Sequence, residues 1–294
     1  MALDIERPWF TYEDHGGQPR ASVSVTDMDQ DAGNISPVAG IVNRYIYTQW
    51  QSPTEDEWFQ IDFGADVAIQ SLTVVFPRIT NPYRKYETQE ILPTDLIRHY
   101  LDADGGTAGA GAVFDSGAVS CKAEATRGYS VTALSTEVTA RYWRCQVNAA
   151  SRASEGFFLV ALGFAGPIFQ PSFPHIYGDK LGFDDNSEIQ RTPSSQTGFV
   201  TRNERTLKAV LVWDFIPDSE RDAWDAMDEH AGKTEPIVYG RPNYDLAATS
   251  AVTGPDFYVL DGKKCFVGNN QSDLSLTSRQ YDANIKQIQL TEHR

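Results

Sequence analysis

Hydrophobic and polar residues alternate in short runs through the first half of the chain, and clusters of Gly, Pro, Asn and Asp separate these runs. Side chains of an extended strand point to opposite faces in turn, so this alternation predicts β-strands joined by turns. Several short strands at such spacing are typical of an antiparallel sandwich. The predicted strands cover residues 21–25, 57–63, 68–76, 95–102, 111–117, 140–147 and 155–164.

The run EWFQIDFG, which begins at residue 57, shows the alternation most clearly. One face is apolar, which predicts core positions for Phe59, Ile61 and Phe63. The residues of the opposite face are Trp58, Gln60 and Asp62. This second face is only mildly polar, which suits a buried protein interface better than bare solvent. We therefore predict that side chains of a neighbouring strand, a loop or a partner subunit cover it.

The second half of the chain begins with a proline-rich segment, GPIFQPSFPHIYGD, at residues 166–179. Proline blocks regular helix, so this segment predicts an extended connector and a domain boundary. We predict that residues 1–166 form an antiparallel β-sandwich and that residues 167–294 form a second β-rich domain. The predicted fold class is therefore mainly β.

The second predicted domain contains the clearest helix signal in the chain, near residues 219–231. Asp218 is the predicted N-cap, and Gly232 is the predicted exit residue. Apolar residues recur at helical spacing on one face, which predicts that they face a core. This stripe consists of Trp224, Met227 and Ala231. Further on, Asp261-Gly262 stands between two alternating runs and predicts a tight hairpin.

The chain carries 40 acidic and 25 basic residues, for a formal net charge of -15. Proteins that hold nucleic acid neutralise phosphates with a basic patch, which this sequence lacks, so stable nucleic-acid binding is disfavoured. The same sign disfavours anionic membrane surfaces. The longest apolar run, residues 156–169, is shorter than the roughly 20 residues that a spanning helix needs, so we expect no membrane insertion. Charges within MALDIERPWF predict no export signal.

Candidate catalytic groups do not gather in any known motif. The five histidines are scattered, and no nucleophile elbow, zinc-protease motif or phosphate-binding loop accompanies them. We therefore predict that the protein is not an enzyme, with a hydrolase as an open alternative hypothesis. The cysteines are widely spaced and are predicted to be reduced and buried. They are Cys121, Cys145 and Cys265.

One acidic cluster, TDMDQDAGN, resembles the start of a calcium-binding loop. Hard cations bind several oxygen ligands from a flexible turn, so the candidate metal ligands are Asp27, Asp29 and Asp31. The pattern departs from an EF-hand, because Gly33 comes one position late and Val38 stands where the bidentate Glu belongs. A solvated loop is the simpler interpretation, and a structural calcium ion is the alternative. No other cofactor is expected.

Four segments, taken in order, resemble the opening of discoidin-type, galactose-binding-like sandwiches. They are SVSVTDMDQDAGN, YTQWQS, EWFQIDFG and AIQSLTVVF. A later segment, ARYWRCQVNA, is similar to the penultimate strand of the same family, in which an arginine precedes alternating aromatics. These matches cover about residues 21–166, and the resemblance implies a jelly-roll sandwich.

The continuation of the chain resembles minor tail and distal-tail structural proteins of long-tailed bacteriophages. In those chains a discoidin-like module meets a second β-rich domain through a G-P-x-F-x-P junction. The matching residues here are Gly166, Pro167, Phe169 and Pro171. The resemblance implies a non-catalytic ring of identical copies at the tail tip, which joins the tail tube and tape measure to the baseplate hub or fibres. It also implies a location in the virion tail, after assembly in the host cytoplasm.

The alternative function is a carbohydrate-binding module that contacts host-surface glycans, because discoidin-like folds often bind sugars through aromatic residues on loops. The residues considered for stacking on sugars are Tyr45, Tyr47, Trp50, Tyr83 and Tyr86. We expect packing or interface roles for Trp50 and Trp58 instead. A closed cyclic oligomer would favour the tail-tip role, and a monomer that binds glycans would favour the module.

Overall fold

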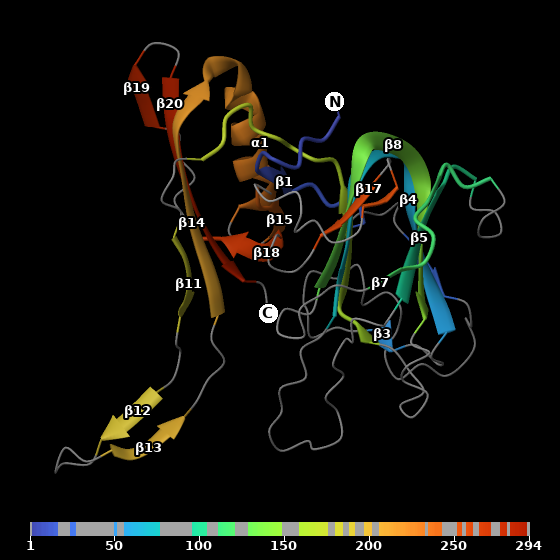
Figure 1. The fold of residues 1–294 in the computed structure, drawn as a ribbon, viewed down its shortest axis with the longest axis horizontal. Coiled ribbons are helices and arrows are strands. Elements are labelled where there is room, and N and C mark those ends of the chain that lie inside the picture. The colour runs from blue at the N-terminus through green and yellow to red at the C-terminus, as the bar shows by residue number, and fades with distance from the viewer. Residues whose placement is uncertain are drawn as a thin grey trace. The chain divides into compact units, whose positions relative to one another are not determined.

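The computed structural model is mainly β, with short strands, two long strands and one α-helix in the part of the chain that it describes (Figure 1). No helix among those residues is long and apolar enough to cross a membrane. The described residues are 2–16, 24–27, 50–51, 56–76, 96–104, 111–120, 129–148, 159–175, 180–184, 188–191, 197–201, 206–232, 235–242, 252–254, 257–260, 265–271, 277–280 and 283–292.

Backbone contacts divide the chain into two compact units. Unit 1 consists of Met1–Gln170, Val238–Phe266 and Arg294. Unit 2 consists of Pro171–Ile237 and Val267–His293. A segment from the C-terminal half of the chain therefore belongs to unit 1. The domain boundary after residue 166 stays a prediction.

Two long antiparallel strands, β4 (Asp56–Val75) and β8 (Tyr129–Asn148), form the centre of unit 1. The sequence predicted two separate strands where the structure has β4, because a local pattern does not show that pairing continues through a bend. Gly64 allows that bend with a backbone φ of 80°, and the β4–β8 register shifts between Asp62 and Val67. Only glycine adopts this φ without strain.

The two halves of β4 and β8 have different neighbours. The first half of β4 pairs with β2 (Ser24–Asp27), and the second half pairs with β10 (Leu162–Gly166). Likewise, β8 pairs at one end with β5 (Leu96–Asp102) and at the other with β17 (Phe257–Leu260). Figure 1 shows β8 arching from one set of neighbours to the other.

Shorter strands complete unit 1. Two of them, β6 (Phe114–Asp115) and β7 (Val119–Ser120), pair with β5. The remaining pairs are β3 (Trp50–Gln51) with β9 (Leu159–Val160), β16 (Val252–Gly254) with β17, and β1 (Trp9–Thr11) with β15 (Pro236–Gly240).

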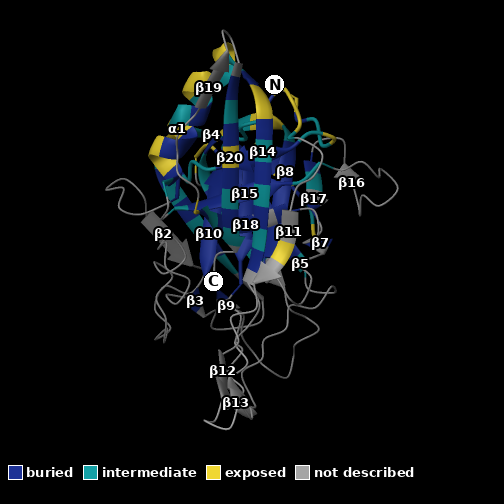
Figure 2. Ribbon diagram, turned by 90° about the vertical axis from the view of Figure 1, so that its left-hand side faces the viewer, coloured by how far each residue is buried: buried dark blue, intermediate teal, exposed yellow. Residues whose placement is uncertain are grey.

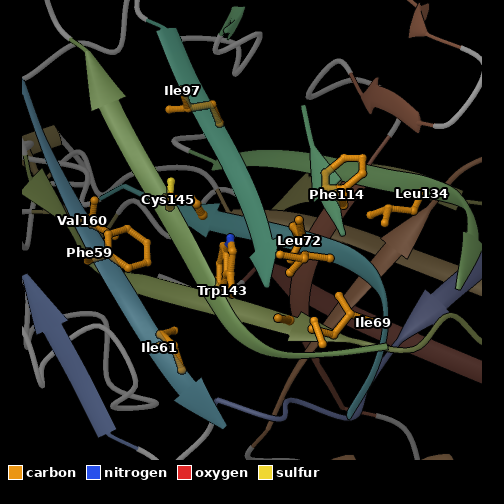
Figure 3. Packing of buried hydrophobic residues seen from close by; sticks show 14 of the residues in the cluster. Phe59, Ile61, Ile69, Leu72, Ile97, Phe114, Leu134, Trp143, Cys145 and Val160 are labelled. Carbon is orange, nitrogen blue, oxygen red and sulfur yellow. The ribbon is translucent and has the colours of Figure 1, made fainter. Parts of the chain in front are cut away.

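The hydrophobic core of unit 1 contains buried residues from both halves of β4 and of β8 (Figure 3). Residues from the first half of β4, such as Phe59, and residues from the second half, such as Leu72, belong to the same buried cluster. The ring of Phe59 lies edge-to-face against Trp50 and Trp143, with both centroid distances at 5.7 Å. The predicted core face of EWFQIDFG is confirmed, since Ile61 and Phe63 are also buried.

Unit 2 is built around β14 (Thr206–Pro217), which pairs with β11 (Lys180–Asp184) and β20 (Ala283–Glu292). Two further strands, β18 (Cys265–Asn270) and β19 (Thr277–Gln280), pair with β20. A separate two-stranded pair joins β12 (Glu188–Arg191) to β13 (Thr197–Thr201). Figure 2 shows buried and more exposed residues alternating along β14 and β20, as expected for strands with one covered face.

The helix α1 (Arg221–Ala231) follows a short 3-10 turn, η3 (Asp218–Glu220). The predicted stripe of Trp224, Met227 and Ala231 is buried, so its core role is confirmed. The predicted N-cap is wrong, because the helix begins after Glu220. Asp218 instead accepts a hydrogen bond from the side-chain amide of Asn284 at 3.1 Å.

The tight hairpin predicted around Asp261-Gly262 is also wrong. The strand before these residues, β17, pairs with β8 and β16, whereas the strand after them, β18, pairs with β20. The turn residues themselves lie outside the described residues. The alternation identified both strands correctly, but a local pattern does not specify which strand supplies the partner.

Candidate functional site

The side of the β4–β8–β5 sheet that points away from the core carries a compact set of polar and aromatic residues, which we call the outer face. Side chains alternate between the two faces of a strand. Phe59, Trp143 and Ile97 turn inward to the core, so the residues next to them in each strand turn outward. Strand register sets three rows: Trp58, Gln146 and Arg98; then Gln60, Arg144 and Tyr100; then Asp62, Tyr142 and Asp102.

Arg144 occupies the middle of the outer face. Its Nε and Nη2 atoms both donate to Oε1 of Gln60, at 2.9 and 2.7 Å. Its guanidinium carbon lies 4.0 Å from the ring centroid of Trp58, in a cation–π contact. Partial burial lowers the pKa of Arg144, against the influence of Asp102 and Tyr100, which raise it. Arginine nevertheless stays charged in proteins, so a cation sits here.

An ion pair flanks Arg144 on one side. Arg141 holds Asp62 through two hydrogen bonds, from Nε to Oδ1 at 2.8 Å and from Nη2 to Oδ2 at 3.0 Å. Partial burial alone would raise the pKa of Asp62, but hydrogen bonds from Arg141 and from the Gly64 amide outweigh it and lower the pKa. The guanidinium of Arg141 also lies 5.0 Å from the ring centroid of Tyr142.

A second ion pair lies at the other edge. Arg98 donates from Nε and Nη2 to the two carboxylate oxygens of Asp115 on β6, and its guanidinium lies 4.8 Å from the ring centroid of Tyr100. The hydrogen bonds from Arg98 are the main cause of the lowered pKa of Asp115. Both flanking arginine side chains are 40% exposed, so a ligand can reach them from solvent.

The structure brings the three interface candidates together. Trp58, Gln60 and Asp62 all lie on the outer face, are partly exposed, and are each contacted by an arginine of β8. Their interface role stays a prediction. The sequence analysis did not select Arg98, Arg141 or Arg144 as site residues. The signal for Arg98 and Arg144 was present in DLIRHYLD and ARYWRCQV, where both occupy outward positions of the alternation. Arg141 has the same phase as the buried Trp143, so the alternation gave no signal for it.

Of the predicted calcium ligands, Asp29 and Asp31 lie outside the described residues, and only the backbone of Asp27 is described, in β2. Within the described ranges, no group of three or more His, Cys, Asp or Glu side chains is arranged to hold a metal ion. The calcium site therefore stays a prediction.

Most of the aromatic residues considered for sugar stacking also lie outside the described residues, namely Tyr45, Tyr47, Tyr83 and Tyr86. Trp50 is described and is fully buried in the sandwich core. It is therefore not a sugar-stacking platform, and its packing role is confirmed. Of the cysteines, Cys145 and Cys265 are buried thiols, as predicted, and Cys121 lies outside the described residues.

Some buried titratable groups are not part of the outer face, among them His99 and the pair of Asp228 and Lys286. In unit 1, His99 is fully buried, and its Nδ1 accepts a hydrogen bond from Trp143 Nε1 at 3.2 Å. Burial lowers the pKa of His99 to about 3, so its imidazole is neutral. In unit 2, Lys286 forms a buried ion pair with Asp228. Burial raises the pKa of Asp228, against the opposing effect of Lys286.

Comparisons with known proteins give structural similarity alone. No family model matches the chain, and no curated protein sequence matches it. It is similar to CpGH89CBM32-5 from Clostridium perfringens, solved with GalNAc-beta-1,3-galactose, at 11% identity over 51% of this chain and 98% of that one, with a TM-score of 0.37. It is also similar to a Streptococcus pneumoniae fucose binding module, at 12% identity over 53% of this chain and 95% of that one, with a TM-score of 0.37. A third similar structure is a Ruminococcus gnavus GH29 fucosidase in complex with fucose, at 12% identity over 52% of this chain and 26% of that one, with a TM-score of 0.35.

Proposed function

We propose that this chain is a non-catalytic carbohydrate-binding protein and that the outer face of unit 1 holds the sugar. The observation that carries the proposal is the arrangement of arginine, carboxylate, amide and aromatic groups around Arg144. Planar polar side chains donate to and accept from adjacent sugar hydroxyls, while the apolar faces of a sugar ring pack on aromatic rings. The outer face combines the polar groups around Arg144 with the partly exposed side chains of Trp58 and Tyr142.

The outer face is also prearranged for binding. Its residues stand on three paired strands, which position side chains more accurately than loops do. Gln60 holds Arg144, and each flanking arginine is fixed by two hydrogen bonds to a carboxylate. Side chains that are already ordered lose little conformational entropy when a ligand arrives, so more of the contact energy appears as affinity. The sequence resemblance to galactose-binding-like sandwiches supports the same proposal.

Binding of the purified full chain to an array of neutral and acidic glycans tests this proposal. We expect binding to at least one glycan class, and Trp58→Ala weakens it about 10- to 100-fold through the loss of ring contact and of support for Arg144. The matched control is Phe215→Ala, which removes another exposed aromatic ring, in unit 2. Absence of binding to every glycan refutes the function. Binding that Trp58→Ala leaves unchanged refutes the site.

A second candidate is the structural role in a phage tail tip, with the tail tube, tape measure and baseplate hub or fibres as partners and the virion tail as location. This candidate rests on the sequence resemblance, and the junction residues that carry the resemblance are ordered in the structure. Phe169 exchanges two backbone hydrogen bonds with Phe10, each 2.8 Å long, and Gly166 packs directly against the backbone of Glu13. The similar structures named above lend this role no support. Rings in electron micrographs of the purified chain would support it, and a monomer that binds glycans would favour the first proposal.

A further inference from the structure

The three guanidinium groups of the outer face differ in how their charge is balanced. Arg98 and Arg141 each hold a carboxylate through two hydrogen bonds, so each forms a neutral pair. Among the residues that the structure describes, Arg144 forms no hydrogen bond or ion pair with a carboxylate. Its side chain contacts the Gln60 amide and the Trp58 ring, and Asp102 is the acid whose charge acts on it. Arg144 is therefore the arginine of the outer face whose N–H groups are not paired with a carboxylate among the described residues.

The hydrogen-bonding capacity around Arg144 is also incomplete. A guanidinium has five N–H donors, and the hydrogen bonds to Gln60 use two of them. Because Oε1 of Gln60 faces Arg144, the amide nitrogen of Gln60 provides further donors. Gln146, which is on β8 like Arg144, lies in the adjacent row of the outer face and is also partly exposed. Donors thus outnumber acceptors at this position, which is the chemistry that a carboxylate ligand requires.

We propose that the carbohydrate bound by the outer face is acidic, and that Arg144 receives the carboxylate of a uronic acid residue. This inference rests on the proposed function. The planar fork of a guanidinium matches a carboxylate with two parallel hydrogen bonds, which a neutral hydroxyl does not reproduce. The Trp58 ring lies against the guanidinium, and the N–H groups of Arg144 that Gln60 does not bind are the donors for the ligand.

The net charge of -15 does not oppose this assignment at short range. At physiological ionic strength, interactions between exposed charges are screened over about 8 Å, so distant acidic residues have little effect on a carboxylate beside Arg144. The two neighbouring carboxylates, Asp62 and Asp115, are each neutralised by an arginine. Asp102 is the remaining acid of the outer face; it is buried on the neighbouring strand β5, and its charge acts on Arg144. A short acidic oligosaccharide is therefore favoured over a long polyanion.

The test compares trigalacturonic acid with its fully methyl-esterified form, which keeps the sugar rings and hydroxyls and removes the charge. Calorimetry with the full chain is expected to show about 10- to 100-fold tighter binding of the acid. Arg144→Gln removes this preference, and Arg144→Lys retains part of it, because lysine keeps the charge but loses the planar fork. The matched control is Arg221→Gln, an exposed arginine of unit 2, which leaves the preference unchanged.

The outcomes separate this inference from the proposed function. If acid and ester bind equally and Trp58→Ala weakens both, the acidic class is wrong and carbohydrate binding stands. If only neutral glycans of the array bind, the acidic class is likewise wrong and carbohydrate binding stands. A preference for the acid that persists in both Arg144 variants, with unchanged thermal unfolding, also overturns the role of Arg144. If no glycan of either class binds, both proposals fail.

Discussion

His99 makes the stability of unit 1 depend on pH in a way that can be measured. Its side chain is fully buried, Trp143 Nε1 donates to its Nδ1, and no hydrogen-bond partner for its Nε2 is present among the described residues. Protonation would place a charge in the sandwich core, so burial lowers the pKa of His99 to about 3 in the folded protein.

The sign and size of the effect follow from proton linkage. In the unfolded chain the histidine has its ordinary pKa of about 6.5, so below that pH the unfolded state binds a proton that the folded state excludes. Stability is therefore lost progressively as pH falls from about 6.5 towards 3. At pH 5.0 the unfolded histidine is mostly protonated and the folded one is not, which costs about 2 kcal/mol relative to pH 7.5.

The assay compares urea unfolding at pH 7.5 and pH 5.0 for the unmodified protein and for His99→Gln. Hydrogen exchange in peptides of β5 and β8 follows unit 1 separately from unit 2. Glutamine does not titrate, and its amide oxygen can accept the hydrogen bond from Trp143, so the variant should lose about 2 kcal/mol less on acidification. The control is His230→Gln, at an exposed position of α1. Equal losses in the unmodified protein and His99→Gln would refute the reasoning.

Two further substitutions test the packing of the two units. Lys286→Met leaves the Asp228 carboxylate buried without its cation, so we expect unit 2 to lose about 3–5 kcal/mol in urea unfolding, and exchange of Asp228 for Leu in the same chain to restore most of it. A single variant as stable as the original would contradict a buried ion pair. Gly166→Ala places a Cβ atom 1.8 Å from the carbonyl oxygen of Glu13, which should cost unit 1 about 1–3 kcal/mol. The control is Gly182→Ala, which has open space around its Cβ atom and should change the free energy of unfolding by less than about 0.5 kcal/mol. Similar losses of stability in the two variants would show that the contact at Gly166 is absent.

The outer face was half visible in the sequence. The alternation in EWFQIDFG assigned Trp58, Gln60 and Asp62 to one side of a strand, and the structure places them there. Their chemistry depends on Arg141 and Arg144, which lie 79 and 84 residues away from their respective hydrogen-bond partners. No local pattern gives the register that sets Arg144 opposite Gln60, so the cation at the centre of the site was not foreseen.

The sequence by itself determined several of the strands, such as those at residues 57–63 and 95–102, together with the place of the helix and the apolar side of each of these elements. These properties depend on side chains two to four residues apart, whose spacing is fixed by the backbone. Only the tertiary structure decided that β4 continues through the bend at Gly64, that β17 and β18 take different partners, and that three arginines meet on one face. Those features depend on contacts between distant segments, because packing of the whole core selects one pairing among several that the local patterns permit.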